Sequence, residues 1–236
     1  MYAQFFTRIF ALICCWILFF VGTAEAQPQR ESIVQLQWKK FSTLQISPGS
    51  HHYGILRQDK WVSALIHNPN TVPVTYYIRF YNPHLNEIEG YKNFSTAPFV
   101  LTGDWFEFQN RPIGFRDFLI PIIVPPLKTD SLLFRLNKRG ESLSIEYQLM
   151  PATDLETEMH MDYLWLGVIV SFVLLVAGVA FFMGFNFGQP LLFIFSIFSV
   201  LALAWQLNNM GIFFQYIWPS KILWHYKSRP FFLSPL

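Results

Sequence analysis

Apolar and polar residues alternate along much of the chain between residues 60 and 150, and this two-residue period is typical of β-strands with one face toward a core. The clearest example is Ser142–Leu149, where apolar side chains occupy every second position. Ser131–Asn137 and Val74–Tyr81 repeat the pattern, whereas Trp61–Ile66 is apolar on both faces and predicts a central strand. We expect three further strands, at Ile88–Tyr91, Trp105–Phe108 and Phe115–Ile123.

Turn-forming residues separate these strands. Asn137–Gly140 predicts a turn that joins Ser131–Asn137 to Ser142–Leu149 as a hairpin, and Asn68-Pro69-Asn70 predicts the turn before Val74. About eight short strands at roughly ten-residue spacing, without a helical period among them, indicate an all-β antiparallel sandwich.

Two long apolar runs follow the strands: Tyr163–Phe182 and Leu191–Leu207, joined by the loop Met183–Pro190. At about 1.5 Å per residue, the uncharged first run can cross a hydrocarbon core of about 30 Å. The sequence therefore predicts transmembrane helices at residues 163–183 and 190–207, then an extracytoplasmic connection and the start of a third span at 208–236. Small residues in the first run can line a contact between the helices, although glycine is common in membrane spans anyway: Ala177, Gly178, Ala180 and Gly184.

The first 26 residues read as a secretory signal peptide. Arg8 supplies a positive charge, Ile9–Val21 is an apolar segment too short for a span, and Ala24-Glu25-Ala26 is a small-x-small cleavage site. Both cysteines of the chain, Cys14 and Cys15, lie in this segment, so the mature protein has no disulfide. Residues 27–160 are then one extracytoplasmic domain. We expect this domain on the outer side of the membrane that the apolar runs cross.

Charge and chemistry exclude several classes of function. The 17 Lys and Arg residues and the 15 Asp and Glu residues are scattered without runs, which argues against nucleic acid as a partner. His51 and His52 are adjacent and would point to opposite faces of a strand, so a metal site there is disfavoured. His67, His84 and His160 are each isolated in the sequence. Catalytic motifs are missing too, so we expect no enzyme activity, no cofactor and no metal.

Polar and aromatic residues gather between Gly103 and Asp117. An arginine fork can bind a carboxylate or a pair of sugar hydroxyls, and tryptophan offers a flat face for a sugar ring. The segment is therefore a candidate ligand-binding site, formed by Asp104, Trp105, Glu107, Arg111 and Arg116. The alternative is structural: Arg111 or Arg116 pairs with Asp104 or Asp117 to hold a loop, while Trp105 belongs to the core. A catalytic pair of Asp104 and Glu107 is disfavoured, because positions i and i+3 of a strand lie on opposite faces.

Four motifs occur in order along this domain: the tryptophan strand and Asn in Lys60–Asn70, the Pro-x-Leu-x-x-Ile segment that ends at Tyr91, the Gly103-Asp104 turn, and Phe108-Gln-Asn-Arg111. The set resembles the type 2 extracellular sensor of bacterial seven-transmembrane receptors with diverse intracellular signalling modules (7TM-DISM). Tyr163–Gly167, the second apolar run and the segment from Asn208 to Pro219 are similar to that family's first two helices and the connection to the third.

This resemblance implies a jelly-roll-like sandwich outside the membrane that binds a carbohydrate or another small ligand. It also implies coupling through membrane helices to a kinase, cyclase or diguanylate cyclase module, which this chain does not include. The alternative is a self-sufficient membrane-anchored carbohydrate-binding or surface interaction module. Membrane lipid and the small ligand are the expected partners, together with a second copy of the chain if the transmembrane helices form a homodimer.

Overall fold

The computed structural model describes residues 32–37, 39–40, 49–55, 57–138, 141–222 and 224–225. The predicted signal peptide at residues 1–26, with Cys14 and Cys15, lies outside the described residues, as does the end of the predicted connection from residue 226 onward.

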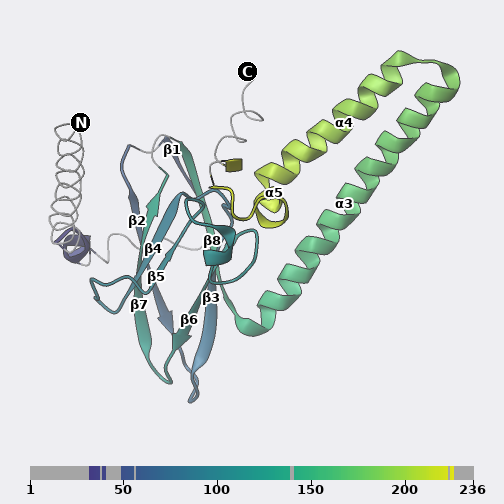
Figure 1. Ribbon diagram of the computed structural model, residues 1–236. Coiled ribbons are helices and arrows are strands. Elements are labelled where there is room, and N and C mark those ends of the chain that lie inside the picture. The colour runs from purple at the N-terminus through teal and green to yellow at the C-terminus, as the bar shows by residue number, and fades with distance from the viewer. Residues whose placement is uncertain are drawn as a thin grey trace, which may run out of the picture.

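Eight strands form two antiparallel four-stranded sheets that pack face to face (Figure 1). One sheet has the order β1-β8-β3-β6 and the other β2-β7-β4-β5, which is the strand order of a jelly roll. The predicted antiparallel sandwich is therefore confirmed. The strands are β1 Gly49–Ile55, β2 Lys60–His67, β3 Val74–Phe80, β4 Glu87–Lys92, β5 Val100–Thr102, β6 Phe118–Val124, β7 Thr129–Asn137 and β8 Ser142–Pro151.

The core lies between the two sheets and explains the alternation in the sequence. Ile78 and Phe80 of β3 and Leu143 and Ile145 of β8 lie on the inner face of one sheet, and Phe134 of β7 lies on the inner face of the other. All five are almost completely buried. The Phe80 and Phe134 rings meet edge to face with centroids 5.5 Å apart. Burying each such side chain stabilises the fold by about 1.5–3 kcal/mol. The space left between the sheets beside Phe80 and Phe134 is about 10 Å³, room for one water molecule at most.

Three sequence predictions about the strands are wrong. β7 and β8 do not form a hairpin: β7 pairs with β2 and β4, while β8 pairs with β1 and β3 in the opposite sheet. β2 is an edge strand rather than a central one; its second apolar face is covered by the helical turn at 32–37, where Val34 is buried beside Trp61. Trp105–Phe108 is not a strand but a turn that leads into a 3₁₀ helix, η1 (Phe108–Asn110).

The turn at Asn68 is confirmed and joins the two sheets. The Asn68 side chain is fully buried. Its amide donates to the carbonyls of Val72, Val124 and Pro125 at 2.8–3.1 Å, and its Oδ1 accepts from the Asn70 N–H at 3.0 Å. This one side chain therefore satisfies the backbone at the point where β2 crosses to β3.

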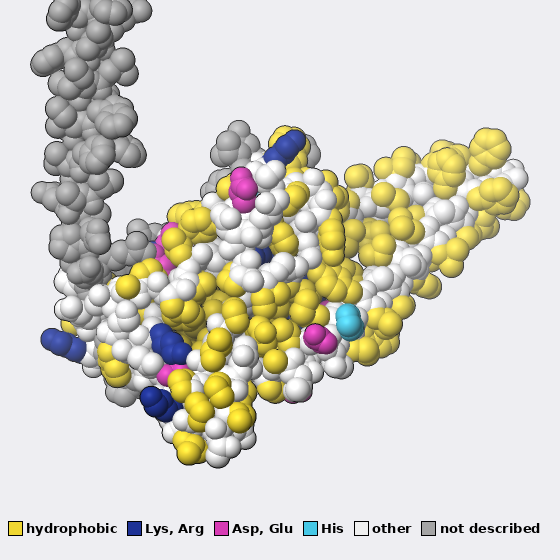
Figure 2. All heavy atoms as spheres, turned by 60° about the horizontal axis from the view of Figure 1, so that its bottom comes forward, with side chains coloured by type: hydrophobic (Ala, Val, Ile, Leu, Met, Phe, Trp, Pro, Cys, Tyr) yellow, Lys and Arg dark blue, Asp and Glu magenta, His cyan; other side chains and the backbone are white. Residues whose placement is uncertain are grey.

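Two long apolar helices follow the sandwich, α3 (Ala152–Phe187) and α4 (Pro190–Asn209), and both are long and apolar enough to span a membrane. They form a hairpin that projects from the sandwich, and its outer part shows hydrophobic side chains and no charged ones on the face seen in Figure 2. Gly188 in the left-handed conformation ends α3 and Pro190 begins α4, as expected at a tight helical turn.

The helix contact uses small residues, in agreement with the sequence. Ala177 and Ala180 are buried against α4, and the Ser196 hydroxyl donates to the Ala177 carbonyl at 2.8 Å. A Cβ on Gly184 would lie 3.2 Å from Leu192 and 3.3 Å from Phe193, whereas one on Gly178 would meet nothing. Gly184 therefore serves the contact and Gly178 does not.

Candidate functional site

The chain that follows α4 folds back onto the sandwich. We call residues 208–225 the docked segment; it contains the short helix α5 (Ile212–Tyr216). The Phe108 N–H donates to the Pro219 carbonyl at 2.8 Å, and the Gln215 amide donates to the Gly114 carbonyl at 3.2 Å. Gln215 also accepts from the Tyr163 hydroxyl of α3 at 2.9 Å. The docked segment thus touches both the sandwich and α3.

Two residues, Gly211 and Phe214, allow the docked segment to lie close against the sandwich. Gly211 has a φ of 76°, and a Cβ there would lie 2.8 Å from Pro83, so this position requires glycine on both counts. Phe214 is 1% exposed and packs edge to face on Phe108 with ring centroids 5.7 Å apart. Phe214 is the apolar anchor of the segment.

Arg111 organises the loop beneath the docked segment. Its guanidinium donates to the carbonyls of Phe115, Arg116 and Pro83, and it lies over the ring of Phe118, with Cζ 4.1 Å from the ring centroid. Burial lowers the pKa of Arg111 to about 9, so the group stays charged at neutral pH. Arg111 thus holds the loop through backbone carbonyls, and the arginine that hydrogen-bonds Asp117 is Arg79.

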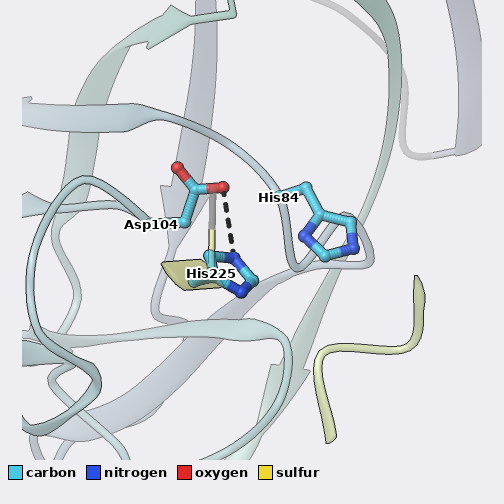
Figure 3. A group of neighbouring side chains, drawn as sticks. All are labelled: His84, Asp104 and His225. Carbon is cyan, nitrogen blue, oxygen red and sulfur yellow. Dashed lines mark ion pairs between the residues drawn. The ribbon is translucent and has the colours of Figure 1, made fainter. Parts of the chain in front are cut away.

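Three residues distant in sequence meet beside Arg111: His84, Asp104 and His225 (Figure 3). One nitrogen or oxygen donor atom from each lies within 4.8 Å of the other two. His225 Nε2 is 3.8 Å from Asp104 Oδ2, and the His225 ring stacks on Phe214 at 4.1 Å. Asp104 and His225 are buried, while His84 is partly exposed. His84, which is isolated in the sequence, therefore lies beside two other possible metal ligands in the structure.

The backbone around each of these residues is held firmly. Gly103 has a φ of 154°, and a Cβ there would lie 2.2 Å from the Asn86 carbonyl oxygen. The next residue, Asp104, donates its N–H to the Leu85 carbonyl at 2.8 Å. The His84 carbonyl accepts from Lys138 at 2.8 Å. Burial, together with the charges of Arg111 and Lys138, lowers the pKa of His225 to about 4, so its imidazole is neutral at pH 7.

A second cluster joins the sandwich to the start of α3. Arg79 of β3 is 2% exposed and donates to Asp117 from Nε at 3.0 Å and from Nη2 at 2.6 Å. Its other contacts are Glu158 at 3.4 Å and Asp162, both on α3. Burial raises the pKa of Asp117, and the neighbouring Arg79 opposes the rise. Glu158 and Asp162 of α3 therefore both bind Arg79.

The five residues of the candidate ligand site have different environments in the structure. Asp104 and Arg111 are buried at the docked segment, and Arg116 joins the Arg79 cluster through Asp162 at 3.2 Å. Trp105 is 47% exposed, so it is not a core residue, and Glu107 is exposed as well.

Arg79, Phe214 and His225 are functional candidates that sequence reasoning missed. An arginine inside the otherwise apolar Val74–Tyr81 pattern is a signal that could have found the first of them.

Comparison with known proteins identifies one matching family. A family model described as 7TMR-DISM extracellular 2 matches residues 23–151. No curated protein matches the chain. One similar solved structure is a family GH115 4-O-methyl-α-glucuronidase with specificity for decorated arabinogalactans: 13% identity, 43% of this chain, 14% of that chain, TM-score 0.28. Another is a family 35 carbohydrate-binding module from an environmental isolate: 13% identity, 45% of this chain, 93% of that chain, TM-score 0.25. The chain spans only a small part of the glucuronidase, and TM-scores this low carry no argument about function.

Proposed function

Because the chain belongs to the 7TMR-DISM extracellular 2 family, we propose that it is the ligand-sensing part of a transmembrane signalling receptor. The matched residues, 23–151, cover the whole sandwich, and the two apolar helices follow it directly. In this proposal the sandwich faces the periplasm or the outside of a bacterial cell, and α3 and α4 lie in the inner membrane.

The observation that carries the proposal is the junction between the sandwich and α3. β8 ends at Pro151 and α3 begins at Ala152, so no flexible linker separates them. At about 1.5 Å per residue, the 36 residues of α3 span about 54 Å, which exceeds a hydrocarbon core of about 30 Å. The first turns of α3 therefore stand outside the membrane, where Glu158 and Asp162 bind Arg79.

This junction gives a physical route for a signal. Arg79 of β3 is buried and binds two carboxylates of α3. A movement of β3 would therefore move the start of the helix. A ligand shifts such a system only if it prefers one of two arrangements of the sandwich on the helix, so the proposal requires that preference. The docked segment makes a second attachment at the end of α4. A plain membrane anchor needs neither attachment, and this favours the receptor over a self-sufficient anchored module.

The proposed ligand is a carbohydrate or another small polar molecule, bound without catalysis. Among the candidate residues, Trp105 and Glu107 are exposed and would contact the ligand, one through its flat ring and the other through its carboxylate. Asp104, Arg111 and Arg116 would then hold the loop that carries them. Arg111 does this through its bonds to the carbonyls of Phe115, Arg116 and Pro83.

A glycan array probed with the full chain in nanodiscs tests the ligand. We expect binding to one class of glycan that Trp105→Ala and Glu107→Gln each weaken, with an unchanged melting temperature, because both side chains are exposed. Phe94→Ala is the matched control, since Phe94 is an exposed aromatic residue in another loop (62% exposed). Binding that both variants leave intact would contradict these residues as ligand contacts, and an array without any bound glycan would contradict a carbohydrate ligand.

A further inference from the structure

We propose that His84, Asp104 and His225 bind a transition-metal dication of the Zn²⁺ type, and that this ion ties the docked segment to the sandwich. Two of the residues belong to the loops of the sandwich and the third to the docked segment, so the site exists only when the two parts are in contact. The proposal is independent of the ligand that the sandwich binds.

The donor set and its spacing fit such an ion. Two imidazole nitrogens and one carboxylate oxygen are a common ligand set for zinc, with bonds of about 2.0–2.2 Å. Tetrahedral bonds of that length put ligand atoms about 3.3 Å apart. His225 Nε2 and Asp104 Oδ2 are 3.8 Å apart, and all three donor atoms lie within 4.8 Å of one another, so the side chains need to move by about 1 Å or less each.

The outer contacts of His84 orient its ring for this role. His84 Nε2 lies 2.9 Å from the Asn209 carbonyl oxygen, which can only accept, so Nε2 carries the proton. The lone pair is then on Nδ1, and Figure 3 shows one ring nitrogen of His84 turned toward His225 and Asp104. A metal-binding histidine usually donates its other N–H to a backbone carbonyl or a carboxylate in this way. Asn209 belongs to the end of α4, so the membrane helix itself contributes to the orientation.

The charges around the cluster select the kind of ion. Arg111 and Lys138 are cations near the cluster, and the charge of each disfavours a bound dication. Each has acceptors of its own: Arg111 bonds three backbone carbonyls, while Lys138 bonds the His84 carbonyl and Glu141. Among the described residues of the cluster, Asp104 alone supplies negative charge, so the site suits ions that bind nitrogen strongly, such as Zn²⁺, rather than Ca²⁺ or Mg²⁺, which need several oxygen ligands.

The first experiment uses the full chain in detergent, stripped with a chelator and titrated with Zn²⁺ or Co²⁺. We expect one ion per chain by elemental analysis, and a Co²⁺ complex with the strong visible absorption of a four-coordinate nitrogen and oxygen site. Hydrogen exchange of the docked segment should slow when Zn²⁺ is added, because the ion joins it to the sandwich. A chain that binds no ion under these conditions, or binds one without either the absorption or the slowed exchange, overturns the proposal.

Substitutions of the three proposed ligands test where the ion binds. His84→Ala, Asp104→Asn and His225→Ala should each lower the Zn²⁺ affinity by about 100-fold or more, since loss of an outer-sphere partner alone costs 10–100-fold. His67→Ala and His160→Ala are matched controls, because both histidines are exposed and should leave the affinity unchanged. If Asp104→Asn fails to fold, the two histidine variants and the Co²⁺ spectrum of the unmodified chain still decide. Equal loss of affinity in His67→Ala or His160→Ala would place the ion elsewhere and overturn the proposal.

Discussion

Replacing Arg79 by Met should destabilise the sandwich strongly, because Met keeps the length and apolar stem of the side chain but removes the charge. Asp117 is then left buried without its arginine; its side chain is 6% exposed. Removing one partner of a buried ion pair costs about 3–5 kcal/mol. The carboxylates of Glu158 and Asp162 are 35% and 30% exposed, so they return to water and add little to this cost. At about 4 °C per kcal/mol for a domain of this size, the melting temperature should fall by roughly 10–20 °C.

The assay is thermal unfolding of the full chain in nanodiscs, followed by near-ultraviolet circular dichroism of the sandwich. Arg57→Met is the matched control, because Arg57 is exposed, and it should shift the melting temperature by no more than a degree or two. The double variant Arg79→Met with Asp117→Asn should recover part of the loss, since it no longer buries an unpaired charge. The reasoning is refuted if Arg79→Met melts together with Arg57→Met.

Three further predictions concern Gly103 beside the site, the turn between the sheets and the docked segment. Gly103→Ala should lower the melting temperature by several degrees, because its Cβ would lie 2.2 Å from the Asn86 carbonyl oxygen; Gly114→Ala, which meets nothing within 4 Å, is the control. Asn68→Ala should cost about 2–3 kcal/mol in chemical unfolding, because it leaves buried carbonyls without a donor, and a cost below 1 kcal/mol would contradict the role of that turn. Phe214→Ala should expose the docked segment to protease while the melting temperature of the sandwich stays nearly constant, whereas unchanged cleavage would show that Phe214 is not its anchor.

Individual strands could be predicted from the sequence because their period is local. Val74–Tyr81 and Ser142–Leu149 alternate since every second side chain enters the core, and β3 and β8 follow those ranges closely. β5 is absent from the prediction, because Val100–Thr102 is too short to show a period. β1 is absent too, since Gly49–Ile55 carries glycines and two histidines instead of an alternating pattern.

Strand pairing could not be predicted, because a turn shows only that the chain reverses direction. The segment after Asn137 leads β7 across the sandwich into the other sheet, although its residues would suit a hairpin equally well. The two apolar faces of Trp61–Ile66 have a similar ambiguity. A central strand and an edge strand covered by another element leave the same pattern, and here Val34 supplies the cover.

The candidate site could be predicted only in part, because its residues come from distant segments. Asp104 and Arg111 stand in one polar loop, which the sequence singles out. His84 comes from the loop after β3, and His225 joins them because the chain returns to the sandwich after α4. No local sequence pattern predicts that return. The same holds for Arg79, whose partners Glu158 and Asp162 follow 79 and 83 residues later.

The most direct test of the account is whether the sandwich and the membrane helices are rigidly coupled. Spin labels on Val72→Cys, an exposed loop position of the sandwich, and on Phe187→Cys, at the end of α3, would report the distance between them in nanodiscs, with Cys14 and Cys15 replaced by Ser. Pulsed electron paramagnetic resonance should give one narrow distance distribution, and two glycines inserted after Pro151 should broaden it. A distribution as broad in the unmodified junction as in the glycine variant would contradict the coupling on which the sensor proposal depends.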